Sequence, residues 1–135
     1  MSANKIVYNI LSNNAALTAL ISTRLNPVRI PQESAFPAVS YQLISDIPNP
    51  TKSGHSRTEF VRVQVNAYGI TLASAESVSS AIRTAFEAVT LPNTFNGIKC
   101  QTIEFDNEIQ TAEDTAAFAG LYQISQDYII NFTRG

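Results

Sequence analysis

The only histidine of the chain lies in a polar segment, Pro48–Arg57 (PNPTKSGHSR), between two runs that alternate apolar and polar residues. Lys52-Ser53-Gly54 matches a phosphate-binding loop only weakly, because the glycine-rich run that surrounds a phosphate is missing and no helix follows. Catalysis by His55 would need a third group to orient the imidazole, and none lies nearby in the sequence. The segment is also longer than the two to five residues that usually close a hairpin. We interpret it as a protruding loop that binds a partner through Lys52, His55 and Arg57.

Three carboxylates alternate in a second segment, at Glu104, Asp106 and Glu108. On a continuous strand all three would lie on one face, spaced about 7 Å apart. They could bind a cation or act as an acid–base pair, but the spacing is too wide for one ion without help from another strand. No Lys or Arg lies between residues 100 and 133. A solvated acidic face is the plainer interpretation.

The remaining residue types offer little for catalysis or metal binding. One histidine and one cysteine, with no Cys-x-x-Cys or His-Glu-x-x-His spacing, leave no nitrogen or sulfur ligand set. We therefore predict no catalytic residue, no metal and no cofactor. Cys100 cannot form an internal disulfide, which fits a reducing compartment, and we interpret it as a small buried apolar side chain in a strand.

Length and charge limit the class of protein. A chain of 135 residues with 44% apolar content fits a single domain over residues 1–135. A net charge of -2 provides no field that would attract nucleic acid or anionic lipid. The first residues do not form a signal peptide, and no apolar run approaches the roughly 18 residues of a membrane span. The expectation is a soluble, unexported chain.

Hydrophobic periodicity predicts the elements that position these residues. Alternation with period two indicates strands, and apolar spacing near 3.6 indicates helices. Three prolines between Arg24 and Pro37 leave room only for a short edge strand. The predicted helices are an N-terminal segment containing Ile6 and Ile10, a second over Ala15–Ile21 capped by Asn13 or Asn14, and a third from Thr71 to about Ala88. The predicted long strands are Ala38–Ile47, Thr58–Tyr68, Ile98–Phe105 and Leu121–Thr133.

The order ααββαββ predicts an α+β domain in which a largely antiparallel sheet of four to five strands packs against the helices. A right-handed crossover through the third helix would let the last strand insert between its neighbours.

The order and spacing of four segments resemble those of the tail-completion or tail-terminator proteins of long-tailed phages, a family that joins heads to tails. These segments are AALTALISTRLNP, PQESAFPAVSYQLIS, RVQVNAYGITLASAESVSSAIRTAF and YQISQDYIINF. The chain departs from the family pattern in a longer acidic connection from Asp106 to Ala117.

The resemblance implies a non-enzymatic, homo-oligomeric ring, typically a hexamer, in the virion tail, assembled in the host cytoplasm. Its implied partners are other copies of itself, the tail tube protein and the head connector or neck protein. DNA would pass through the ring without specific binding, and no membrane is involved. Another connector or adaptor ring, or a small regulatory binding module, remains an alternative.

The acidic stretch would have a function in such a ring. Carboxylates on the wall of a channel repel phosphates, whereas Lys and Arg hold them. We therefore expect part of this stretch to face the lumen. Its candidate residues are Glu104, Asp106, Glu108, Glu113 and Asp114.

Overall fold

A computed structural model describes residues 2–28, 35–48, 58–95, 97–113 and 121–133. The elements follow the order ααβββαβββ, which adds two three-residue strands to the predicted order ααββαββ. The helices are α1 (Ser2–Ser12), α2 (Ala15–Ile21) and α3 (Leu72–Ala88). The strands are β1 (Leu25–Pro27), β2 (Ala38–Pro48), β3 (Thr58–Gly69), β4 (Asn93–Phe95), β5 (Ile98–Glu113) and β6 (Leu121–Thr133).

One six-stranded sheet has the order β1-β2-β3-β6-β5-β4. The α+β class is confirmed, and β6 does insert between β3 and β5. The predicted count of four to five strands is wrong, and the sheet is mixed, because β1 pairs with β2 in parallel while all other pairs are antiparallel. The additional strand β4 has three residues, too few to show a period in the sequence.

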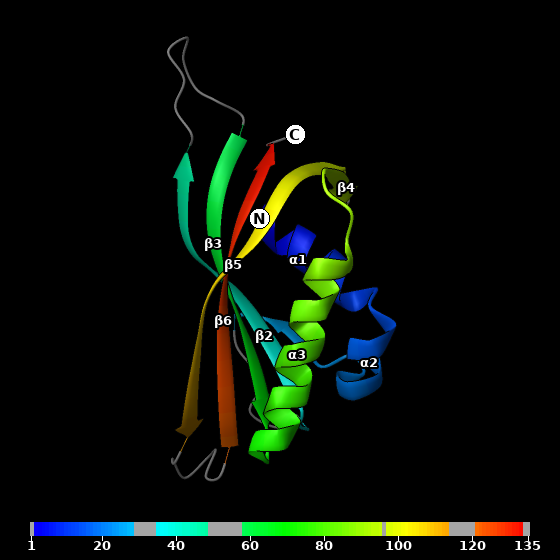
Figure 1. Cartoon of the computed structure of the whole chain (residues 1–135), viewed down its shortest axis with the longest axis vertical. Coiled ribbons are helices and arrows are strands. Elements are labelled where there is room, and N and C mark those ends of the chain that lie inside the picture. The colour runs from blue at the N-terminus through cyan, green and yellow to red at the C-terminus, as the bar shows by residue number, and fades with distance from the viewer. Residues whose placement is uncertain (1, 29–34, 49–57, 96, 114–120, 134–135) are drawn as a thin grey trace.

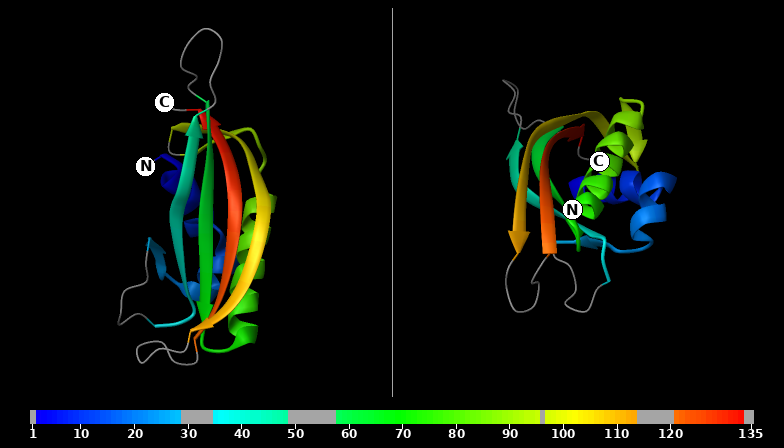
Figure 2. Two further views of the ribbon diagram at one scale, coloured as in Figure 1. Left: turned by 90° about the vertical axis from the view of Figure 1, so that its left-hand side faces the viewer. Right: turned by 60° about the horizontal axis from the view of Figure 1, so that its bottom comes forward.

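All three helices lie on the same side of the twisted sheet, with α2 packed against α1 and α3, and no helix of the described residues covers the other face (Figures 1 and 2). β3 shows the reason most clearly, because Val61, Val63 and Val65 alternate with polar residues and are fully buried beneath the helices. The core therefore lies between one face of the sheet and the apolar stripes of the helices. In α3 the buried stripe contains Ala75, Val78, Ile82, Ala85 and Phe86.

Side-chain caps begin two of the helices at the positions that the sequence predicts. The Asn14 carboxamide oxygen accepts a hydrogen bond from the Leu17 N–H at 2.9 Å, and the Thr71 hydroxyl accepts one from the Ser74 N–H at 3.1 Å. Gly69 lets α3 begin close to the end of β3, since a Cβ there would lie 2.7 Å from the Ala75 nitrogen.

Candidate functional site

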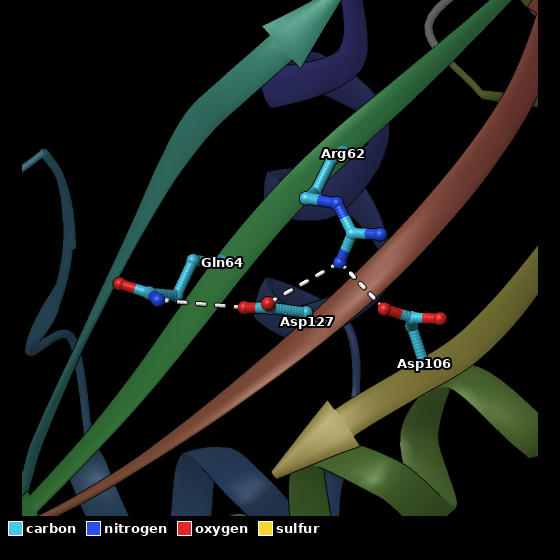
Figure 3. Close-up of polar contacts among 4 residues, drawn as sticks. All are labelled: Arg62, Gln64, Asp106 and Asp127. Carbon is cyan, nitrogen blue, oxygen red and sulfur yellow. Dashed lines mark hydrogen bonds and ion pairs between the residues drawn. The ribbon is translucent and has the colours of Figure 1, made fainter. Parts of the chain in front are cut away.

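The helix-free face of the sheet carries a cluster of four polar side chains, which we call the charged cluster: Arg62, Gln64, Asp106 and Asp127 (Figure 3). The Nη1 atom of Arg62 lies 2.6 Å from the Asp106 carboxylate and 3.3 Å from the Asp127 carboxylate. The Gln64 amide donates to the other oxygen of Asp127 at 3.4 Å. Three strands thus contribute side chains to one ion-pair network.

The network determines how Arg62 can act. The hydrogen bond to Asp106 raises the pKa of the guanidinium, and the charge of Asp127 adds to the effect. Arg62 is therefore already engaged by two carboxylates, with its side chain about a third exposed. Because the cation is neutralised within the chain, it is poorly suited to hold a phosphate.

A second group of neutral residues, the amide cluster, continues along the same face. Asn66 is its centre: its amide donates to the Ser40 hydroxyl at 3.2 Å, and its carbonyl accepts from Ser125 at 2.6 Å and from Gln123 at 3.1 Å. Ser40 is only 1% exposed and Asn66 4% exposed. Alternation predicts both on the solvent side, and they do lie on the helix-free face. Their hydrogen bonds within the cluster compensate for the loss of water on burial.

The predicted acidic face is divided by a β-bulge. Glu104 lies opposite Ile129 and Phe105 opposite Tyr128, but Asn107 is next in register, opposite Asp127. The extra residue is Asp106, and it reverses the alternation that follows it. The prediction that Glu104, Asp106 and Glu108 share one face is therefore wrong.

The three carboxylates have different surroundings. Glu104 is exposed in the same row of the helix-free face as Arg62, and Asp106 pairs with that arginine. Glu108 lies on the helix side, where its carboxylate accepts from the Gln126 amide at 3.0 Å. Glu113 belongs to β5, but its side chain and the whole of Asp114 lie outside the described residues.

On the helix side, Gln126 joins the sheet to α3. Its amide also donates to the Ser79 carbonyl at 3.1 Å, and its own carbonyl accepts from the Tyr128 hydroxyl at 2.7 Å. Burial raises the pKa of Tyr128 well above its usual range, so this hydroxyl keeps its proton and donates. A hollow of about 300 Å³ lies next to Glu108 and Gln126, but the buried polar atoms beside it are already paired.

Neither catalysis nor metal binding gains a candidate from the described residues. Cys100 is fully buried, as predicted, and burial raises the pKa of its thiol to about 11, so it is not a nucleophile at neutral pH. In the described part of the chain, no group of three or more His, Cys, Asp or Glu side chains could hold a metal ion. Lys52, His55 and Arg57 lie outside the described residues, so the partner-binding loop stays a prediction.

No helix in the described ranges is both long and apolar enough to cross a membrane.

Comparison with known proteins identifies the family. The model of the family "Tail completion protein gp17" matches residues 5–130, and the chain belongs to this family. The resemblance noted in the sequence is thus confirmed, and the family supports a structural role in phage tail or head–tail assembly.

The fold is also found among solved structures. A chain from the "Virion of native gene transfer agent (GTA) particle" is similar with a TM-score of 0.72 and 18% sequence identity, over 94% of this chain and 91% of that one. No curated protein sequence matches the chain significantly.

Proposed function

We propose that the chain forms a homo-oligomeric ring, a hexamer by family resemblance, that caps the phage tail tube. The ring ends polymerisation of the tube and presents its other side to the head connector. The observation that carries this proposal is the family match over residues 5–130. The single α+β unit, with a helix-covered face and a polar face, supplies distinct surfaces for neighbours, as a ring of identical chains requires.

We further propose that the helix-free face lines the channel of the ring. Around Arg62 it carries three carboxylates, Glu104, Asp106 and Asp127, against this one guanidinium. The guanidinium is already paired with carboxylates, so around this cluster passing DNA meets an excess of negative charge and no free arginine. Such a wall repels phosphates instead of binding them.

Electron microscopy of purified chain mixed with tail tubes tests the ring. We expect a ring at one end of each tube and an end to further growth of the tube. A ring that binds only to the head connector would favour the adaptor alternative, and a chain that stays monomeric with tubes present would contradict the proposal.

Charge reversal tests the channel wall. Particles with Glu104→Lys and Asp106→Lys should eject their genome more slowly, because two new cations would face the phosphates. Glu108→Lys is the matched control, since Glu108 lies on the helix side of the sheet. Equal effects of the two changes, or normal ejection by the double variant, would contradict a channel role for the helix-free face.

The loop with Lys52, His55 and Arg57 remains a proposed contact with the tube or with an adjacent copy. Deleting residues 51–56 should leave a folded chain, because the segment contains no large apolar side chain and shortening a loop changes chain entropy little. Tail assembly by the deletion variant should be impaired. Normal tail termination by this variant would remove the loop from the mechanism.

A further inference from the structure

Both long outer strands of the sheet are left mostly unpaired on one side. The short strand β1 pairs with β2 only at Val39–Tyr41 in β2, and β4 pairs with β5 only at Ile98–Cys100. Within the described residues, β2 from Gln42 onward and β5 from Gln101 onward therefore have no neighbour on their outer side. Free N–H and C=O groups along such an edge can pair with a strand from another chain.

The directions of these two strands suit a ring. Each neighbouring pair in the series β2, β3, β6 and β5 is antiparallel, so β2 and β5 run in opposite directions. Rotation about an axis roughly parallel to the strands leaves their directions unchanged. The β2 edge of one copy would then meet the β5 edge of the next copy in antiparallel orientation. This contact joins two different edges, as ring closure requires.

Each free edge also carries one exposed isoleucine. Among the described side chains of β2 and β5, the exposed large apolar residues are Ile44, at 45%, and Ile109, at 50%. Placing one beside the other would remove part of the apolar surface of each from water.

Bringing Ile44 of one copy beside Ile109 of the next requires a register shift between copies, and the size of this shift is that found in closed barrels. Across the sheet, Ile109 is in register with Ser125, Asn66 and Ser40 in turn. Moving from Ser40 to Ile44 shifts the register by four residues over four strands, or one residue per strand. Eight-stranded barrels with a shear of eight have the same ratio, and their strands tilt by about 36°.

We propose that residues 42–46 of β2 pair with residues 107–111 of β5 in a second copy of this chain, with Ile44 beside Ile109. The sheets of successive copies then form one continuous sheet around the ring. The bulge at Asp106 lies just before the β5 segment and hinders pairing at registers that extend past it. This inference rests on the proposed ring, because the contact joins identical copies head to tail.

Cysteine cross-linking tests the contact in the full chain. The double variant Ile44→Cys/Ile109→Cys is treated with a bismaleimide that spans about 8 Å, enough to bridge directly opposite residues of an antiparallel pair, whose Cβ atoms lie about 4.5–5.5 Å apart. We expect a ladder of covalent oligomers on a denaturing gel. An equimolar mixture of the two single variants should give a covalent dimer and nothing larger, because each chain then has one reactive edge. Cys100 is buried and common to all variants. The matched control is Ile44→Cys/Ile70→Cys, since Ile70 is exposed but lies outside both strands, and it should give no ladder.

Light scattering on the unmodified chain distinguishes failure of the proposed edge contact from failure of the proposed ring. An oligomeric chain whose double variant shows no ladder overturns the edge contact and leaves the proposed ring intact. A chain that stays monomeric with tail tubes present and gives no ladder contradicts both. Cross-linking of the single Ile109→Cys variant into homodimers would also overturn the inference, because it would show like edges meeting.

Discussion

The hydrogen bonds through which Gln126 links the sheet to α3 should contribute measurably to the stability of the fold. The side chain is 2% exposed and bonds to the Tyr128 hydroxyl, the Ser79 carbonyl and the Glu108 carboxylate. Gln126→Leu keeps most of the volume and removes all three bonds. The Tyr128 hydroxyl is then left without its acceptor, whereas the Ser79 carbonyl, inside α3, keeps its helical hydrogen bond. A buried polar group without a partner costs about 1–3 kcal/mol, so we expect a loss of roughly 1–3 kcal/mol in the free energy of unfolding.

A double-mutant cycle isolates the central bond. Tyr128→Phe leaves only the Gln126 carbonyl without its donor and should cost about 1 kcal/mol. Combining the two substitutions removes the hydroxyl that Gln126→Leu leaves unpaired. The double variant should therefore lose about 1 kcal/mol less than the sum of the single changes.

Urea unfolding followed by circular dichroism measures all four chains. Glu108→Gln serves as the control, since an amide oxygen can still accept from Gln126, and it should change stability by less than about 0.5 kcal/mol. If the losses from the two single changes add within about 0.3 kcal/mol, the reasoning is refuted, because the coupling free energy between Tyr128 and Gln126 would then be close to zero.

Three further outcomes follow from the core, a thiol and a helix cap. Val63→Asp should unfold the chain in circular dichroism by burying an unpaired charge, whereas Asp at the exposed Thr84 should not. Because the pKa of Cys100 is raised, the folded chain keeps a thiol proton that the unfolded chain loses above pH 9.0. The free energy of unfolding should therefore be unaffected by this thiol below pH 9.0 and fall by at most about 2.7 kcal/mol as the pH rises toward 11. Denaturation across that range should show a smaller decline for Cys100→Ala, and an equal decline would exclude the thiol as a cause. Thr71→Ala should lower thermal stability by about 1 kcal/mol through loss of the bond to the Ser74 N–H, and an unchanged melting temperature would contradict this role of the cap.

The core elements could be predicted because each has one apolar face against one layer. The alternation of Val61, Val63 and Val65 and the stripe of α3 follow directly from the periods of strand and helix. The caps at Asn14 and Thr71 are equally local, since each depends on a side chain and an N–H group three residues later. Such features need no knowledge of the strand that pairs with them.

The candidate site depended on partners that the local sequence does not reveal. The bulge at Asp106 arises in the pairing of β5 with β6. It reverses the alternation, so Phe105 before the bulge points into the core and Ile109 after it lies on the helix-free face. Strict alternation therefore fails, and β5 continues to Glu113 where the pattern predicts an end near Phe105. The ion pair between Arg62 and Asp106 joins residues 44 positions apart. Its geometry follows from the sheet order and not from sequence spacing.

The central position of β6 has a consequence for how the chain folds. β2 and β3 are consecutive and can form a hairpin early, but β3 and β5 cannot be joined until β6, the last strand in chain order, pairs with both. The register of β3 with β6 joins Thr58 to Thr133, so the closing contacts are strongly non-local. Chains dominated by such contacts fold slowly, and the open edges of β3 and β5 can meanwhile pair with other chains. Newly made copies therefore have to complete the sheet before neighbours approach, and the concentration of unfinished chains becomes a limit on the yield of assembly.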